Sequence, residues 1–222
     1  MTRDHVIVLP GGGYSRLSAN ESQPIVDWLE SIGLSSSVFE YPVKTRHPAV
    51  LDAVRGEIRR QRDAGAERVG LIGFSAGGHL ASSAGTRFGK ALIDNRNNTS
   101  LRPDFMLLVY PRIILGDKER PGSVVKLIGE NAPQELIDLY STDRQVTGNT
   151  PPTFLVHAGD DRTAPVQNSL LFYQALLKHQ VKAEMHIYQA GGHGFGLDNS
   201  TTPDVWFERC LNFLEQNKFL VR

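Results

Sequence analysis

The sequence has few of the features that mark extracellular, membrane or nucleic-acid-binding proteins. It holds one cysteine, Cys210, so it cannot form an intramolecular disulfide and requires no oxidising compartment. Lys plus Arg and Asp plus Glu number 24 each, which leaves no basic excess for a nucleic-acid backbone. No apolar run is long enough to span a bilayer, and no signal-peptide core is visible at the N-terminus. We expect a cytoplasmic protein with neither nucleic acid nor membrane as a partner.

Motifs for metal and phosphate binding are missing as well. The chain contains no H-E-x-x-H motif and no paired cysteines, so we expect no metal site. A glycine-rich stretch occurs at residues 11–13, but Arg16 interrupts the G-x-G-x-x-G spacing, and no G-K-[ST] follows. The sequence therefore predicts neither a metal site nor a phosphate-binding loop.

Six short apolar runs follow one another along the 222 residues, and most are continuous rather than alternating. Continuous runs are typical of strands covered on both faces, and the segments between them have helical spacing. This alternation indicates an α/β fold, with helices on both faces of a mostly parallel sheet of about six strands. We expect three layers and a single domain over residues 1–222. The predicted strands lie at residues 6–9, 37–41, 69–74, 105–110, 154–157 and 185–188.

One connection, residues 112–150, is longer than the others and contains a helical piece at 133–140. Such an excursion in an open α/β sheet lies near the carboxyl ends of the strands, where ligands bind. We interpret it as part of a pocket wall rather than as a second domain.

The strongest local motif is G-F-S-A-G at residues 73–77, which fits G-x-S-x-G. A predicted strand ends at Ser75 and a helix of small residues follows, as a nucleophile elbow requires. Gly73 and Gly77 remove side chains that would clash with neighbouring backbone. Ser75 is therefore the candidate nucleophile.

The glycine-rich loop after the first strand supports this interpretation. Acyl transfer needs hydrogen-bond donors aimed at the oxyanion, and glycines let backbone N–H groups approach it closely. We expect the N–H groups of Gly12, Gly13 and Ala76 to form the oxyanion hole.

Two further loops supply the other members of a Ser-His-Asp triad. After the fifth predicted strand come two adjacent acids, of which Asp161 has the better position and Asp160 is the alternative. After the sixth strand, His193 stands between glycines with room to reach the serine, and it completes the chain order Ser, Asp, His. His79 fits better as a packed residue of the helix after Ser75.

These motifs together resemble the bacterial acetylxylan-esterase-like α/β-hydrolases. The similarity rests on P-G-G-G-Y at 10–14, G-F-S-A-G-G-H-L-A at 73–81, the Tyr-Pro pairs at 41–42 and 110–111, and the segments 150–176 and 186–197. It departs from the family in having Pro10 where related esterases have histidine, and Ala164 where valine is usual. The chain also begins at what would be the third strand of the full hydrolase sheet, which predicts a reduced, parallel sheet.

The resemblance implies a serine carboxylesterase that acts without a cofactor on small acyl esters, above all acetyl esters of carbohydrates. Since no export signal is visible, we expect acetylated oligosaccharides or small esters rather than polymeric xylan. Tyr14, Tyr41 and Tyr110 lie near strand ends or the glycine-rich loop, where they either line the pocket or pack in the core. Two alternatives remain: an amide-cleaving hydrolase of the arylformamidase or peptidase type, and a non-catalytic binding protein on the same fold.

Overall fold

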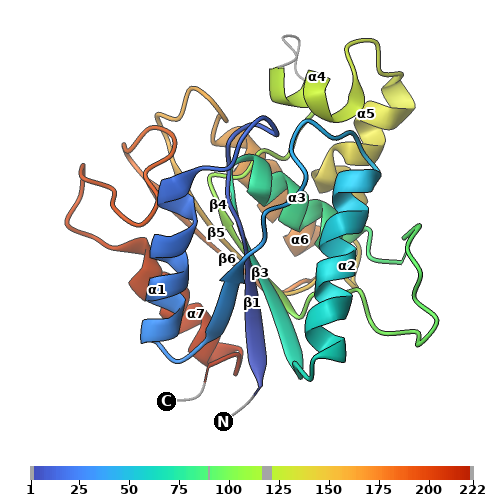
Figure 1. Cartoon of the computed structure of the whole chain (residues 1–222). Coiled ribbons are helices and arrows are strands. Elements are labelled where there is room, and N and C mark those ends of the chain that lie inside the picture. Colours follow the sequence, from blue (N-terminus) through green and yellow to red (C-terminus); the bar gives the residue numbers. More distant parts are fainter. Residues whose placement is uncertain (1–2, 90, 117–121, 221–222) are drawn as a thin grey trace.

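Six parallel strands form one sheet in the order β2-β1-β3-β4-β5-β6 (Figure 1). The computed structural model describes residues 3–89, 91–116 and 122–220. The parallel sheet of about six strands expected from the sequence is confirmed. The strands are β1 (Asp4–Leu9), β2 (Ser35–Val38), β3 (Arg68–Phe74), β4 (Phe105–Val109), β5 (Thr153–Ala158) and β6 (Ala183–Tyr188).

Helices cover both faces of the sheet and give the predicted three layers (Figure 1). Successive strand residues point to opposite faces, so Val6 and Val8 belong to one core cluster while Ile7 and Leu9 belong to the other. One cluster lies under α1 (Gln23–Ser31) and α7 (Trp206–Gln216). The other lies under α2 (Ala49–Asp63), α3 (Ala76–Thr86) and α6 (Gln167–Lys178).

The position of the second strand differs from the prediction of residues 37–41. The strand is β2, at an edge of the sheet, and it pairs with His5–Val8 of β1. It is mostly serine, so its apolarity does not reveal it. The aromatic residues Phe39 and Tyr41, which suggested a strand, follow it in a loop and pack into the core on the α2 side.

The excursion over residues 112–150 contains α4 (Gly122–Ile128), α5 (Gln134–Tyr140) and a 3₁₀ turn at Thr142–Gln145. Its residues 117–121 lie outside the described residues. α5 matches the predicted helical piece, whereas α4 was not predicted. Both helices lie at the end of the molecule toward which β1 and β3 run (Figure 1).

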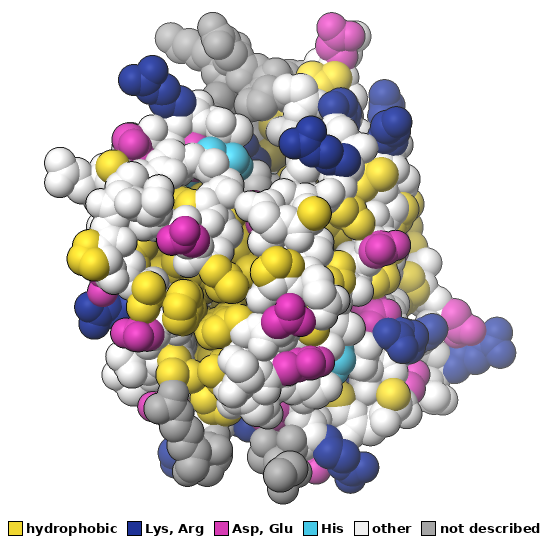
Figure 2. Space-filling model, turned by 60° about the vertical axis from the view of Figure 1, so that its left-hand side comes forward, with side chains coloured by type: hydrophobic (Ala, Val, Ile, Leu, Met, Phe, Trp, Pro, Cys, Tyr) yellow, Lys and Arg dark blue, Asp and Glu magenta, His cyan; other side chains and the backbone are white. Residues whose placement is uncertain are grey.

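Hydrophobic side chains reach the surface on the face that carries α1 and α7 (Figure 2). Trp28 and Ile32 from α1 and its C-terminal end, and Phe207 and Leu211 from α7, are only partly buried there. Cys210, on the inner side of α7, is buried, so its thiol packs as a small apolar group. Among the described residues, every helix is too short or too polar to cross a membrane.

Candidate active site

Ser75 occupies a strained turn between β3 and α3. Its backbone has φ 51° and ψ −114°, a region that costs free energy for a residue other than glycine. Neighbouring backbone holds the turn, because the Ser75 N–H donates to the carbonyl of Val109 at 3.1 Å. A Cβ atom on Gly77 would lie 2.0 Å from the carbonyl oxygen of Leu9, so only glycine lets α3 approach β1 this closely. The result presents the Ser75 hydroxyl at the N-terminus of α3.

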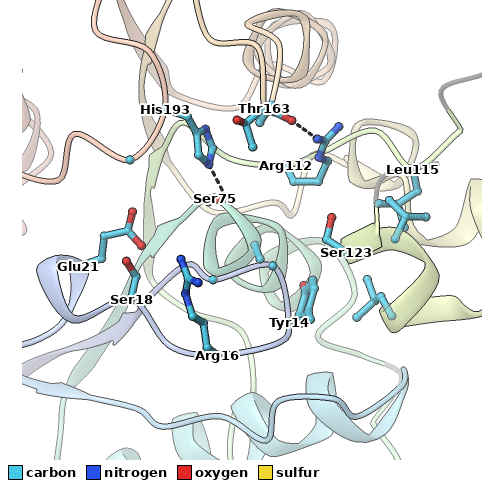
Figure 3. A pocket seen from close by; sticks show the side chains of 17 residues that line it. Tyr14, Arg16, Ser18, Glu21, Ser75, Arg112, Leu115, Ser123, Thr163 and His193 are labelled. Carbon is cyan, nitrogen blue, oxygen red and sulfur yellow. Dashed lines mark hydrogen bonds between the residues drawn. The ribbon is translucent and has the colours of Figure 1, made fainter. Parts of the chain in front are cut away.

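The three side chains predicted as a triad form a continuous hydrogen-bonded chain. His193 Nε2 lies 2.8 Å from Ser75 Oγ (Figure 3). On the other side of the ring, His193 Nδ1 lies 2.6 Å from Asp161 Oδ2. Because a carboxylate accepts, Nδ1 donates to Asp161 and Nε2 is left to accept from the Ser75 hydroxyl. Asp160 does not reach His193. It is exposed and accepts a 2.8 Å hydrogen bond from the N–H of Gly192, so it orders the loop after β6 that carries His193.

Asp161 is surrounded by donors. Its Oδ1 accepts the backbone N–H groups of Thr163 and Ala164 at 2.8 and 2.9 Å. Burial acts to raise the pKa of the Asp161 carboxyl, but hydrogen bonds from His157, His193 and Ala164 outweigh burial and hold that pKa well below its usual range. The carboxylate is therefore ionised when it holds His193.

His157 is a second histidine on Asp161 that sequence reasoning missed. Its Nε2 lies 3.1 Å from Asp161 Oδ2 and 2.7 Å from the carbonyl oxygen of Ala164. A carbonyl can only accept, so Nε2 carries the proton, and Nδ1 accepts from the Ser169 hydroxyl at 2.8 Å. The spacing of four residues between His157 and Asp161 was the available signal. His157 is fully buried and fixes the orientation of the carboxylate.

The residues predicted for the oxyanion hole lie beside Ser75. Gly12, Gly13 and Ala76 all line one cavity with Ser75 and His193. Gly12 has φ +119°, and a Cβ atom there would lie 2.2 Å from the carbonyl oxygen of Arg16, so the turn excludes any side chain. No acceptor is found within the described residues for the N–H groups of Gly12 and Gly13. Ala76 is the first residue of α3, where an N–H has no acceptor inside the helix.

The cavity has a volume of about 400 Å³ and mixes polar and apolar walls (Figure 3). The apolar wall comes from Leu115, in the segment after β4, and from Val124 and Leu127 in α4. Polar side chains of the lining are Arg16, Ser18, Glu21, Arg112, Ser123 and Thr163. A small acyl group and a polar alcohol both fit such a space.

Of the three tyrosines considered for the pocket, only Tyr14 lines it. Tyr41 is buried and its hydroxyl donates to the carbonyl of Pro10 at 2.6 Å. Tyr110 is fully buried and its hydroxyl donates to Glu21 at 2.7 Å. Both side chains support the loops from beneath, and the expectation that they could line the pocket is corrected.

His79 packs inside α3 as predicted. Its Nε2 donates to the carbonyl of Tyr140 at 2.8 Å, so its Nδ1 accepts from the hydroxyl of Tyr14 at 2.7 Å. Burial lowers the pKa of His79 to about 4, which keeps the ring neutral. Across residues 3–89, 91–116 and 122–220, no cluster of three or more His, Cys, Asp or Glu side chains is placed to hold a metal ion.

The sequence is similar to those of known hydrolases. Residues 127–218 match the profile of the prolyl oligopeptidase family. An acetylxylan esterase of Xylanibacter ruminicola is 34% identical over 217 residues, a match that covers 91% of this chain and 42% of that protein. The chain spans 34% and 42% of the lengths of the two curated relatives that match it over 217 residues.

Solved structures are similar over nearly the whole chain. An acetyl ester-xyloside bifunctional hydrolase from Caldicellulosiruptor lactoaceticus is 41% identical, with a TM-score of 0.90 and coverage of 98% of this chain and 84% of that chain. The carboxylesterase Cest-2923 from Lactobacillus plantarum WCFS1 is 26% identical, with a TM-score of 0.80 and coverage of 99% and 87%. The arrangement of sheet, helices and loops is therefore shared with hydrolases of known structure.

Proposed function

This chain belongs to the acetylxylan-esterase-like α/β-hydrolases, and on that premise we propose that it is a serine esterase that removes acetyl groups from carbohydrate hydroxyls. The observation that carries the proposal is the hydrogen-bonded chain from Ser75 through His193 to Asp161. Beside it lie the N–H groups of Gly12 and Gly13, which find no acceptor among the residues that the structure describes. A nucleophile, its base and donors for an oxyanion meet at one wall of the cavity, which is the arrangement that acyl transfer needs.

In the first half of the reaction, Ser75 Oγ attacks the ester carbonyl carbon while His193 Nε2 takes the hydroxyl proton. Asp161 holds the imidazole in the tautomer that can accept and stabilises the imidazolium that forms. The N–H groups of Gly12, Gly13 and Ala76 bind the oxyanion. The tetrahedral intermediate then collapses, the carbon–oxygen bond to the alcohol breaks, and His193 returns the proton to the leaving alkoxide.

In the second half, water attacks the acetyl-serine carbonyl while His193 accepts a proton from it. Collapse of this intermediate breaks the bond to Ser75 Oγ, which regains its proton from His193, and acetic acid leaves. The polar lining, including Arg16, Ser18 and Ser123, supports an alcohol rich in hydroxyl groups. The limited cavity supports a short acyl chain.

The test is hydrolysis of p-nitrophenyl acetate, butyrate and octanoate, together with acetylated xylo-oligosaccharides, by wild type and Ser75→Ala. We expect rates that fall with acyl length, acetate release from the sugar ester, and loss of nearly all turnover in Ser75→Ala. Ser31→Ala, an exposed serine at the end of α1, is the matched control and should keep wild-type activity. Failure of wild type to hydrolyse any ester in a Ser75-dependent way would refute the proposal.

The match to the prolyl oligopeptidase family makes amide cleavage the second candidate. An aryl formamide and peptide p-nitroanilides should be tested beside the esters, and faster Ser75-dependent turnover of an amide would replace the esterase. Labelling of Ser75 by a fluorophosphonate probe would exclude a purely non-catalytic binding protein.

A further inference from the structure

A buried carboxyl group beside the glycine-rich loop takes no part in the steps above. Glu21 ends the short 3₁₀ turn Ala19–Glu21, lines the cavity near Ser75 and is 3% exposed (Figure 3). In the part of the chain that the structure describes, Glu21 forms no ion pair with a lysine or arginine. Burying such a group is costly unless hydrogen-bond donors meet its oxygens, so its donors indicate its role.

Among the described residues, each carboxyl oxygen of Glu21 has one hydrogen-bond donor. Oε2 accepts the backbone N–H of Gly11 at 2.7 Å, and Oε1 accepts the hydroxyl of Tyr110 at 2.7 Å. Gly11 is confined between two groups, because a Cβ atom on it would lie 2.7 Å from Glu21 Oε2 and 3.0 Å from Ser75 Cβ. Gly11 directly precedes Gly12 and Gly13, so Glu21 holds the peptide next to the proposed oxyanion donors.

Tyr110 continues the connection to the opposite loop. Its hydroxyl accepts the N–H of Gly196 at 2.9 Å, and the carbonyl of Gly196 accepts from Trp206 Nε1 at 2.9 Å. Burial, and after it the nearby Glu21, raise the pKa of Tyr110 well above its usual value, so the hydroxyl keeps its proton and donates to Glu21. The Tyr110 ring centroid lies 5.0 Å from that of His193.

The neighbouring residue of the same turn makes a second, parallel contact. Asn20 Nδ2 donates to the carbonyl of Gly194 at 3.1 Å, directly beside His193. The turn that carries Glu21 therefore bridges two loops that are separated by most of the chain: the glycine-rich loop after β1 and the histidine loop after β6. Only a carboxylate can accept both of these hydrogen bonds, because a side-chain amide has one accepting oxygen and a donating N–H₂ group in place of the other.

We propose that Glu21 is a positioning residue. It orients the N–H groups of Gly12 and Gly13 and the imidazole of His193 toward the same ester carbonyl. It acts through Gly11 on one side and through Tyr110 on the other. This inference rests on the proposed function, since it assigns Glu21 to the oxyanion hole of that reaction. A displacement of about 1 Å in such a site costs on the order of 10²-fold in rate. Loss of the Glu21 hydrogen bonds should therefore have a measurable effect on the rate.

The experiment compares wild type, Glu21→Ala and Glu21→Gln on p-nitrophenyl acetate. Glu21→Ala releases both donors, and we expect kcat to fall by about 10²-fold, as for loss of one oxyanion donor, with KM unchanged. Glu21→Gln still accepts from Gly11 but turns an amide N–H₂ toward the Tyr110 hydroxyl, so its kcat should lie between those of Glu21→Ala and wild type. Glu30→Gln, an exposed carboxyl on α1, is the matched control and should keep wild-type kcat.

A merely structural role is separated by titrating competent Ser75 with diethyl p-nitrophenyl phosphate, which releases one p-nitrophenolate per reactive serine. Positioning predicts a full titration and a lower kcat per titrated site. A lower titratable fraction with unchanged kcat per site would overturn the inference, and Glu21→Gln decides this if Glu21→Ala does not fold. Unchanged kcat in both variants would overturn the role of Glu21 and leave the proposed function standing. A wild type that neither hydrolyses an ester nor reacts with the titrant would refute the proposed function as well.

Discussion

Replacement of Asp161 by asparagine tests the reasoning about the triad most directly. In the wild type, Oδ1 accepts the N–H groups of Thr163 and Ala164, and Oδ2 faces His193. An amide N–H₂ cannot accept those two backbone bonds, so the amide oxygen of Asn must take the place of Oδ1. The N–H₂ group then points at His193 Nδ1, which can meet it only as an acceptor.

This substitution should trap His193 in the wrong tautomer. With Nδ1 unprotonated, the proton of the neutral ring sits on Nε2 and faces Ser75 Oγ, so the ring cannot take the hydroxyl proton. We expect kcat for p-nitrophenyl acetate to fall by about 10⁴-fold, as in protease triads. This loss corresponds to roughly 5 kcal/mol of transition-state stabilisation. Because asparagine has the same size as aspartate and the residue lies outside the cavity lining, KM should change little.

Asp160→Asn is the matched control, since it makes the same chemical change one residue away. Asp160 is exposed and accepts only from the N–H of Gly192 among the described residues, a bond that an amide oxygen can also accept. We expect its kcat to stay within a few-fold of wild type. A larger loss in Asp160→Asn than in Asp161→Asn would refute the assignment of the acid.

Three further predictions concern stability and the glycine-rich loop. Trp206→Ala empties a fully buried site and should cost about 3–5 kcal/mol in urea unfolding; less than about 1 kcal/mol would contradict this packing. Gly12→Ala forces a Cβ atom against the carbonyl of Arg16 and should lower kcat by about 10²-fold or more. The control is Gly56→Ala in α2, where a Cβ atom meets open space, and it should leave kcat unchanged and raise stability. Because the pKa of Asp161 is depressed in the folded state, its carboxylate stabilises the fold at pH values above the usual aspartate pKa. The difference in unfolding free energy between wild type and Asp161→Asn should therefore shrink as the pH falls below about 4. A difference that stays constant with pH would contradict the depressed pKa.

Much of the sheet could be predicted because its central strands are buried on both faces. Residues 69–74 and 105–110 are nearly continuous apolar runs, and β3 and β4 match them within a residue. The edge strand β2 breaks the rule, since three of its four residues are serine. At an edge one side of a strand has no neighbouring strand, so selection for apolar residues is weaker there, and hydropathy alone misplaced the strand.

The proposed site was predictable where backbone geometry restricts residue type. Gly73, Gly77 and Gly12 stand where a Cβ atom would collide with backbone oxygen, so the motif records the shape of the turn. Sequence gives no such record for Glu21. It lies ten residues after Gly11 in a polar turn, and only the fold shows that its carboxyl group reaches back to that N–H.

The depth of aromatic side chains was also unreadable from sequence. Tyr110 follows β4 directly, as a pocket residue would, yet its backbone has φ 36° and its side chain is fully buried. Tyr41 follows β2 at a loop and is likewise buried. Position along the chain places a residue at the correct end of the sheet, but side-chain direction depends on local dihedral angles that composition does not reveal.

In the proposed mechanism, bond cleavage and substrate choice depend on separate segments of the chain. Ser75, Asp161 and His193 lie on short turns just after β3, β5 and β6, whereas the apolar wall of the cavity comes from Leu115, Val124 and Leu127. Substitutions in that wall can therefore change which ester binds without touching the groups that transfer protons. A mutant library confined to α4 would explore new substrates while keeping the wild-type pH profile, and evolution has the same freedom.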